Sequence, residues 1–347
     1  MKKALTLVLA LTMLVGVLAG CQSAASSTPA STGSTAAGSS STAPGTSAEG
    51  TMVAAIFGGA INDGNWNQTQ YNGLMNIGAL GAETAFVENT SDTDAAQAAR
   101  DYATAGFQLI YLTTNSYQDY CTPVAADFPD ATFISINGTI VQDNYISVRI
   151  ADEEQGFMMG VAAALLSKTG KVGFVGGLEI NPIKLGATGF QQGVDYVNEN
   201  YGLSVEATII NTGSFTDVNQ AKETAIAMID SGCDVVTPMA NDAGVGVMEA
   251  AEEKGVMAIA SGIGQEASAP TATQLTVVKD VAVAYDVTFA AFLDGSLKAT
   301  TEVEKYGANR GVVFLTGDDS LESEISTRLN EVMEKLKNNE ITIDLTV

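Results

Sequence analysis

Residues 52–59 read Met-Val-Ala-Ala-Ile-Phe-Gly-Gly, an uninterrupted apolar run that ends in two glycines. Such a run without polar alternation predicts a strand that is buried on both faces, as in a parallel sheet covered by helices. A helical pattern follows over residues 67–80, and short apolar strands then alternate with helices as far as residue 136. This alternation predicts a doubly wound α/β unit.

The alternation restarts after a helix expected over residues 152–168. A second doubly wound unit is therefore expected to follow the first, which makes the chain an α/β protein with two parallel sheets. A strand running into a long helix is expected over residues 274–293, and a last strand over 311–315 precedes a charged helix over 321–338. The strands expected in the second unit are 171–175, 205–211, 235–237 and 256–260.

Open α/β sheets bind ligands beyond the carboxyl ends of their strands, so the residues after each strand are candidates for a site. The first strand is followed by Asn-Asp-Gly-Asn-Trp-Asn-Gln, residues 62–68, which include Trp66, the only tryptophan of the chain. A tryptophan between amides and a carboxylate can be a platform for a flat polar ring, because stacking on a base contributes ~1–3 kcal/mol. Two simpler interpretations stay open: Trp66 covers an edge of the core, and Asn67 caps the helix start.

These residues resemble the signature of a known family. Residues 62–68, together with Tyr-Asn-Gly-Leu at 71–74, look like the signature of the basic membrane protein family. The resemblance spans roughly residues 52–315 and implies a lipoprotein that binds purine nucleosides for an ABC importer. It also implies a type I periplasmic-binding-protein fold, in which two doubly wound lobes are joined by a hinge with three chain crossings. Further similar segments lie at residues 128–130, 170–177, 213–217 and 277–281.

The resemblance implies roles for single residues of this chain. In the family an aromatic residue stacks on the base, the asparagine after it hydrogen-bonds the base, and an aspartate lies in the same pocket. Carried over to matching positions, these residues are Trp66, Asn67 and Asp63. The half of the site that reads the base therefore matches the family.

The half of the site that reads the sugar departs from the family pattern. Family carboxylates that take ribose hydroxyls are replaced here by Asn137 and by Gly262. Asparagine is a weaker acceptor than a carboxylate, and glycine offers only its backbone. Lys279 matches a family lysine near the sugar, and its alternative interpretation is a solvated lysine. These departures put the nucleoside in question, but less so a small, flat, polar ligand.

Two short segments of the second unit contain weaker candidates for ligand contacts. Phe215 follows a strand and could close on the ligand opposite Trp66, although a core phenylalanine fits the pattern equally well. Asn241 and Asp242 follow the strand at 235–237 and resemble the Asn-Asp of sugar-binding relatives. For Asp242 in particular, an N-cap of the next helix is the alternative.

Composition excludes several classes of function. The net charge of −24, from 40 acidic and 16 basic residues, argues against nucleic acid and against adsorption to anionic lipid. The chain has no histidine, which excludes Ser-His-Asp and Cys-His catalysis and His-ligated zinc. We expect no metal, no cofactor and no enzymatic activity. Cys121 and Cys233 are expected to be free buried thiols, with a disulfide between them as the alternative.

The first 21 residues predict export and lipidation. Lys2 and Lys3 precede an apolar stretch over residues 4–19, and Leu-Ala-Gly-Cys at 18–21 resembles the bacterial lipobox. This implies a lipoprotein signal peptide at 1–20 and an acylated Cys21 on the extracytoplasmic face of a bacterial, Gram-positive cell membrane. A plain signal peptide and a single membrane-spanning helix are the alternatives. The rest of residues 21–50 is rich in Ser, Thr, Ala and Gly, which predicts a flexible tether.

The two lobes are assigned from these expected elements. An N-terminal lobe is expected from residues 51–150 plus 271–305, and a C-terminal lobe from 151–270 plus 306–347, with crossings near residues 150, 270 and 305. The expected function is a monomeric substrate-binding protein that captures a purine nucleoside or related heterocycle and passes it to an ABC permease and its ATPase. The alternatives are a ligand-binding sensor lipoprotein and an extracellular nucleoside hydrolase.

Overall fold

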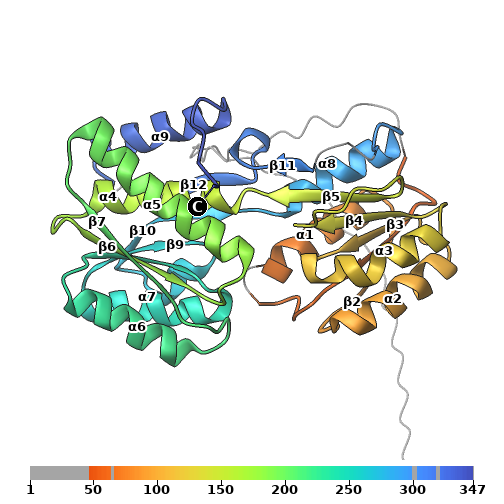
Figure 1. The fold of residues 1–347 in the computed structure, drawn as a ribbon, viewed down its shortest axis with the longest axis horizontal. Helices are drawn as coiled ribbons and strands as arrows, with labels where there is room; N and C mark the ends of the chain where they lie inside the picture. The colour runs from red at the N-terminus through yellow and green to blue at the C-terminus, as the bar shows by residue number, and fades with distance from the viewer. Residues whose placement is uncertain (1–46, 64–65, 299–302, 318–320, 347) are drawn as a thin grey trace, which may run out of the picture. The chain divides into compact units, whose positions relative to one another are not determined.

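The computed structural model describes residues 47–63, 66–298, 303–317 and 321–346. The expected signal peptide at 1–20, the expected lipidation site Cys21 and the expected tether as far as residue 46 lie outside the described residues. Within those described, no helix is both long enough and apolar enough to cross a membrane. The described residues form one compact unit that contains two six-stranded sheets (Figure 1).

The first sheet is parallel throughout and has the strand order β11-β5-β4-β3-β1-β2. In β1, Val53 and Ala55 pack into the core that includes α1 and α8, whereas Ala54 and Ile56 pack into the core beneath α2 and α3. This burial on both faces is the reason why the first strand is apolar without interruption. The strands are β1 (Met52–Ile56), β2 (Glu83–Val87), β3 (Leu109–Leu112), β4 (Thr132–Ile136), β5 (Tyr145–Ile150) and β11 (Glu304–Tyr306), and the helices are α1 (Trp66–Ala79), α2 (Asp92–Thr104), α3 (Gln118–Asp127) and α8 (Ala282–Leu293).

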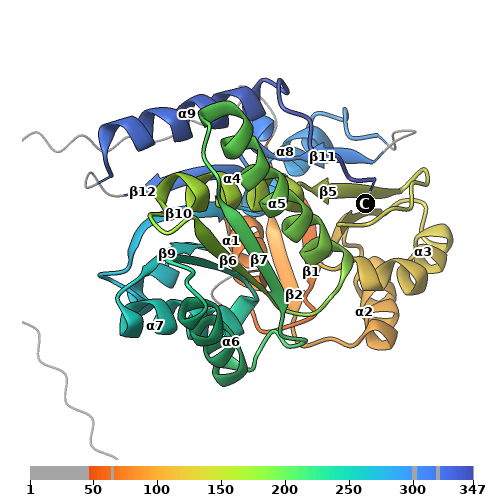
Figure 2. The ribbon, with the colours of Figure 1, turned by 60° about the vertical axis from the view of Figure 1, so that its left-hand side comes forward.

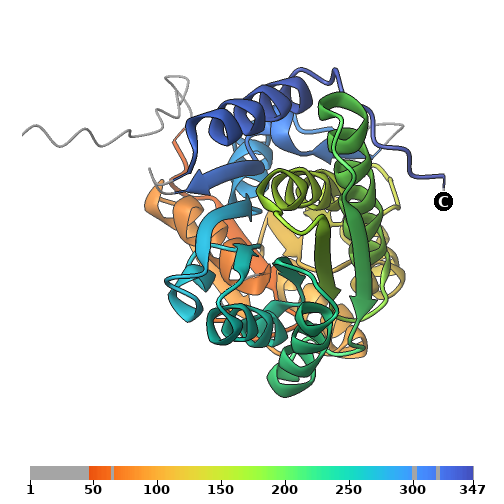
Figure 3. The same ribbon diagram turned by 90° about the vertical axis from the view of Figure 1, so that its left-hand side faces the viewer.

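The second sheet has the order β12-β10-β9-β8-β6-β7 and is parallel except for β12, which runs antiparallel to β10. Helices α4 and α5 (green) cover one face and α6 and α7 (teal) the other (Figures 1 and 3). The strands are β6 (Lys171–Gly176), β7 (Glu206–Asn211), β8 (Val235–Met239), β9 (Met257–Ala260), β10 (Thr273–Lys279) and β12 (Val313–Gly317), and the helices are α4 (Asp152–Leu166), α5 (Asn181–Tyr201), α6 (Val218–Asp230), α7 (Gly244–Lys254) and α9 (Ser323–Lys337).

The chain passes between the two sheets three times, which confirms the predicted fold class. The crossings follow β5, β10 and β11, and they lie on the same side of the unit, toward the top of Figures 1 and 2. We call residues 150–152, 279–282 and 306–313 the hinge. Two of the strands that flank the hinge, β5 and β11, are not among the strands expected from the sequence.

The expected assignment of residues 271–305 to the first lobe is wrong for strand β10. Thr276 of β10 pairs in parallel register with Ala260 of β9, so β10 extends the second sheet. Its apolar side chains Val277 and Val278 are buried there, which leaves the second crossing near residue 280 instead of 270. β11 does pair with β5 in the first sheet.

Glycines on α4 and α5 let these two helices approach closely. A Cβ atom on Gly189 of α5 would overlap the carbonyl oxygen of Glu153, and one on Gly193 would overlap the carbonyl oxygen of Phe157. On α4, Gly156 and Gly160 meet the α5 backbone in the same way. The glycines of α5 are therefore explained by the close packing of these two helices.

Candidate functional site

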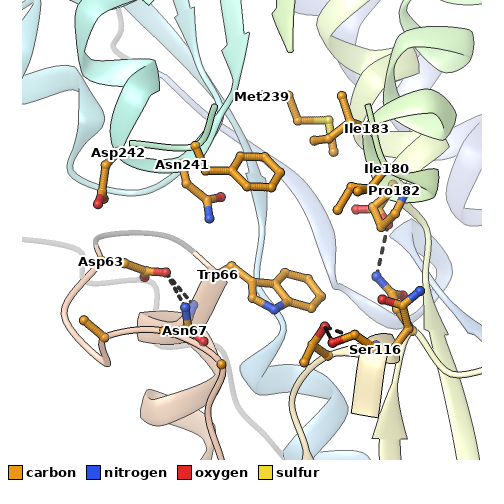
Figure 4. A pocket seen from close by; sticks show the side chains of 18 of the residues that line it. Asp63, Trp66, Asn67, Ser116, Ile180, Pro182, Ile183, Met239, Asn241 and Asp242 are labelled. Atoms are coloured by element: carbon orange, nitrogen blue, oxygen red, sulfur yellow. Dashed lines mark hydrogen bonds between the residues drawn. The ribbon is translucent and has the colours of Figure 1, made fainter. Parts of the chain in front are cut away.

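A cavity of about 560 Å³ opens between the carboxyl ends of the two sheets, and residues of both lobes line it. Its position follows the rule that ligands of open α/β sheets bind where the strands end. Figure 4 shows Asp63 and Trp66 on one side of the cavity and Met239 and Asn241 on the other. All seven residues singled out from the sequence line it: Asp63, Trp66, Asn67, Asn137, Phe215, Asn241 and Lys279.

Asp63 caps the start of α1 and orients Asn67. Its carboxylate accepts hydrogen bonds from the backbone amides of Asn67 and Gln68, both at 3.0 Å. The side-chain amide of Asn67 donates to the same carboxylate at 2.8 Å (Figure 4). The cap is thus Asp63 and not Asn67, and the Asn67 amide oxygen, on a side chain that lines the cavity, accepts no hydrogen bond from the described residues.

Trp66 is held by its ring nitrogen, which leaves the position of its ring well defined. The indole N–H donates to the carbonyl oxygen of Thr113 at 3.0 Å, and the Gln70 amide donates to the same oxygen at 3.2 Å. The ammonium of Lys279 lies 5.4 Å from the centre of the ring, a cation–π contact. Trp66 also packs on the core, which confirms the core-edge interpretation, and it lines the cavity as well, so its role as a platform for a flat ring stays a prediction.

Lys279 is paired with a buried carboxylate that the sequence analysis did not identify. Its ammonium lies 2.5 Å from Asp152 Oδ1, and the exposed fractions of the two side chains are 9% and 1%. The solvated-lysine interpretation of Lys279 is therefore wrong. Burial raises the pKa of Asp152 above its ordinary value, while the charge and the hydrogen bond of Lys279 oppose this rise.

Asn137 takes part in the same cluster. Its backbone is left-handed, with φ of 59°, at the end of β4. The amide oxygen accepts from the Ile150 backbone N–H at 2.7 Å, and the amide nitrogen donates to Asp152 Oδ2 at 3.3 Å. Both the oxygen and the nitrogen of the Asn137 amide thus already have a hydrogen-bond partner within the protein. Gly262 is buried and is not among the lining residues, whereas its neighbour Ser261 is.

Four consecutive polar side chains at the start of α4 form ion pairs and hydrogen bonds with the segments that flank the hinge. Asp152, Glu153, Glu154 and Gln155 are each at most 3% exposed. Three carboxylates in the first turn of a helix interact favourably with the positive end of the helix dipole. Because they are buried and have lost their hydration, they also need partners of opposite charge or hydrogen-bond donors. Each residue has partners in a different segment: Asp152 pairs with Lys279, Glu153 with Arg149 at 2.7 Å, Glu154 with Lys305 at 2.5 Å, and the Gln155 amide donates to the carbonyl oxygens of Ser261 and Val277 at 2.8 and 3.0 Å.

Asn241 and Asp242 approach the cavity from the second lobe. They form a single 3-10 turn with Ala243, and Asn241 is left-handed with φ of 46°. The N-cap of α7 is Ala243, without a side-chain cap, so the interpretation of Asp242 as an N-cap is wrong. The pKa of Asp242 is raised mainly by burial. The negative charge of Asp63 on the facing lobe raises it further (Figure 4).

The second lobe contributes an apolar wall that the sequence analysis largely missed. Phe215 packs against Gly177, where any Cβ atom would overlap the phenyl ring. Met239 ends β8, and its side chain lies beside Ile183 of α5 (Figure 4). The further apolar residues of this wall are Ile180 and Pro182. Only Phe215 was singled out from the sequence, although Met239 also lies just after the strand expected at 235–237.

The loop after β3 supplies further polar lining residues that were missed. The Ser116 hydroxyl donates to Asp92 at 2.7 Å, and the Tyr117 hydroxyl donates to the carbonyl oxygen of Thr90 at 2.8 Å. Burial raises the pKa of Tyr117, so it remains a neutral donor. A rule based on strand ends would have found Ser116, because β3 was itself expected from the sequence.

The two thiols lie apart from the cavity. Cys121 and Cys233 are both buried and free, which confirms the expectation and rules out the disulfide alternative. Burial raises the pKa of Cys121 to about 12, so it is an unreactive thiol. Among the described residues, no three Cys, Asp or Glu side chains form a group that could hold a metal ion.

Two α/β lobes with a hinge of three crossings, and a cavity between their strand ends, define a two-lobed ligand-binding protein. A family model described as ABC transporter substrate-binding protein PnrA-like matches residues 51–346. The chain belongs to this family, which confirms its resemblance to the basic membrane proteins.

Similar proteins agree with this assignment. The chain is 29% identical to a purine-binding protein of Brucella abortus over 76% of this chain and 74% of that protein. It is 28% identical to a transcriptional activator protein, med, of Bacillus subtilis over 75% of this chain and 80% of that protein. An ABC transporter solute-binding protein of Aeropyrum pernix superposes with a TM-score of 0.73 at 22% identity, over 84% of this chain and 92% of that chain, and has the same fold.

Proposed function

We propose that this member of the family is a lipid-anchored receptor of an ABC importer that captures a purine nucleoside, or a related heterocycle, between its lobes without turning it over. The substrate-binding family supports import, and the relative from Brucella abortus, which is named a purine-binding protein, supports a purine. The lobes would close on the ligand about the hinge. The closed complex would then dock on a permease.

The observation that carries the ligand class is the setting of Trp66. Its ring nitrogen is fixed to Thr113, and its ring lines a cavity of about 560 Å³. A flat heterocycle can stack on such a fixed ring at little entropic cost, because the platform is already in place before binding. Phe215, which lines the cavity from the facing lobe, would cover the other side of the heterocycle on closure.

The polar groups beside Trp66 fit the edge of a base. The oxygen of the Asn67 amide can accept from an amino group or ring N–H of a purine, because its NH₂ is already bonded to Asp63. Asn241, on the other lobe, offers a second amide to the same cavity. A ligand that carries both a flat apolar face and edge donors therefore satisfies the two kinds of group at once.

Lipid anchoring rests on the sequence of the first 21 residues. Cys21 as a lipidated N-terminus, with a tether of about thirty residues, would keep the two lobes near a permease while leaving them free to rotate. We propose the extracytoplasmic face of a Gram-positive cell membrane as the location and a monomer as the working state.

Isothermal titration of the soluble body, residues 47–347, tests the ligand class. Purine nucleosides, pyrimidine nucleosides, free bases and free sugars should be compared at one ionic strength. We expect binding of at least one purine nucleoside and weaker binding of the matched pyrimidine. Absence of heat with every purine compound would remove the purine assignment.

A sensor is the second candidate, because the Bacillus subtilis relative is named as a transcriptional activator. A sensor would bind the same ligand in the same cavity and pass the signal to another protein. Uptake of radiolabelled nucleoside in cells with and without the gene separates the two functions. Loss of uptake favours import, and unchanged uptake with altered transcription favours sensing.

A further inference from the structure

The charges that line the cavity are strongly unbalanced. Among the described lining residues Lys279 is the only cation, whereas Asp63, Asp92, Asp152 and Asp242 are carboxylates. The Lys279 charge is moreover paired with Asp152 at 2.5 Å, and both side chains are buried. The one positive group that could attract an anionic ligand is therefore already neutralised.

The cavity is small enough for each of these charges to affect the binding of an anionic ligand. A volume of about 560 Å³ corresponds to a sphere roughly 10 Å across, which is comparable to the Debye length of about 8 Å at physiological ionic strength. A phosphate in this space would therefore lie close enough to several carboxylates for their repulsion to be only partly screened. Like charges held in an interface oppose binding and act as a selectivity device.

We infer that Asp152 is a specificity-determining residue: by neutralising Lys279 it makes the cavity reject phosphorylated ligands and accept only uncharged ones. The inference rests on the proposed function, because it names the uncharged nucleoside over its 5′-phosphate as the ligand of the same site. Asp152 also acts as a positioning residue, because it holds the Lys279 ammonium 5.4 Å from the centre of the Trp66 ring.

The arrangement of neighbours explains why Asp152 can have this role. Its second oxygen accepts from Asn137, whose own amide oxygen is bonded to Ile150. Residue 137 is therefore an uncharged support, and the carboxylate beside Lys279 comes from the first turn of α4 instead. An asparagine at position 152 would keep the shape of the side chain but leave Lys279 as an unpaired buried cation, which favours an anion.

The test compares three probes: a purine nucleoside such as adenosine, its 5′-monophosphate, and inorganic phosphate alone. Calorimetry gives the affinities, and emission of Trp66, the only tryptophan, reports phosphate binding beside Lys279. In the wild type we expect the nucleoside to bind at least 100-fold more tightly than the monophosphate, with no response to inorganic phosphate. In Asp152→Asn we expect this ratio to fall at least tenfold and inorganic phosphate to bind.

Two control variants separate selectivity from general damage. Asp152→Asn combined with Lys279→Gln removes both charges, so the gain of phosphate binding should disappear. Glu154→Gln removes another buried carboxylate of the same helical turn that does not line the cavity, so its selectivity ratio should equal that of the wild type. Should Asp152→Asn fail to fold, Asp152→Ala replaces it, because the removed side chain leaves room for an anion beside Lys279.

The outcomes are distinct. An unchanged selectivity ratio and no phosphate binding in a folded Asp152 variant overturn the inference, as does equal phosphate binding in the double variant. If no purine compound binds to any variant, the proposed function fails. The phosphate arm still judges the inference in that case, because it uses no purine.

Discussion

Lys279 and Asp152 form a buried ion pair, with the ammonium 2.5 Å from the carboxylate, at the point where the ligand cavity meets the hinge. Lys279 ends β10 in the second sheet, and Asp152 opens α4 directly after the first crossing. The pair thus joins two crossings of the hinge and also faces Trp66. Lys279 and Asp152 therefore belong both to the cavity and to the hinge, so we expect a change at either of these two residues to affect both ligand binding and the hinge.

Replacement of Trp66 should damage binding much more than folding. Trp66→Ala removes the stacking face, for which ~1–3 kcal/mol is typical, and we expect affinity for the nucleoside to fall at least tenfold. Trp66→Phe keeps an aromatic face and should lose less. Titration calorimetry gives the affinities, and thermal unfolding shows whether each variant is folded. Ligand should also change the emission of the single tryptophan, and an unaltered affinity in Trp66→Ala would make its role purely structural.

Removal of the α1 cap should lower both stability and affinity. In Asp63→Ala the helix loses its N-terminal cap, which costs about 1 kcal/mol, and Asn67 loses the partner that orients it. Asp217→Ala is the matched control, because Asp217 caps α6 through the Gln220 amide at 3.0 Å and does not line the cavity. We expect similar losses in urea unfolding but a loss of affinity only in Asp63→Ala. Equal affinities would contradict the role given to the Asp63–Asn67 pair.

Asp234 should give the protein an acid-sensitive part of its stability. Burial tends to raise its pKa, but hydrogen bonds from Ser167 and from the amides of Lys168 and Thr169 outweigh burial and hold the pKa below the ordinary value of 3.8. A depressed carboxyl pKa contributes stability above the unfolded-state pKa that is lost as pH falls through the folded-state pKa. Asp234→Asn should therefore destabilise the protein at pH 7 and progressively less below about pH 4. Urea unfolding at several pH values measures this, and a difference independent of pH would contradict it.

The contact between α4 and α5 should not tolerate side chains at its glycines. Gly189→Ala would place a methyl group against the carbonyl of Glu153, and overpacking of this kind typically costs 1–3 kcal/mol. Gly78→Ala in α1 is the control, because its Cβ would lie 3.3 Å from Thr84 Oγ1 and alanine favours a helix by about 1 kcal/mol. We expect a clear fall in the unfolding midpoint for Gly189→Ala only. Similar midpoints for both variants would show that α4 and α5 can move apart.

Membrane attachment should depend on Cys21. Cys21→Ser removes the thiol that lipidation requires, so the protein should appear in the medium or keep its signal peptide. Cell fractionation and metabolic labelling with a fatty acid measure this. Cys121→Ser is the matched control, because Cys121 is a buried thiol of the folded body and should leave labelling intact. Undiminished labelling of Cys21→Ser would refute the anchor.

The sequence by itself determined the α/β class and most of the site. The apolar run at 52–57 could be interpreted alone, because double burial forces every residue of a strand to be apolar. The motif around Trp66 and Asn67 is local, and Phe215 and Asn241 follow expected strands, so a rule about strand ends pointed to them. Lys279 was found through the resemblance to the family.

Only the tertiary structure decided which charged side chains form ion pairs and which strands are neighbours in a sheet. Asp152 follows β5, a strand not expected from the sequence, and its partner Lys279 lies far along the chain, at the end of a strand that was expected in the other lobe. β10 pairs with β9, the strand before it in the chain, and the apolar pattern of β10 does not encode which sheet it joins. A charge pattern in the sequence shows which groups must be paired when buried, but only the folded chain brings the partner to 2.5 Å.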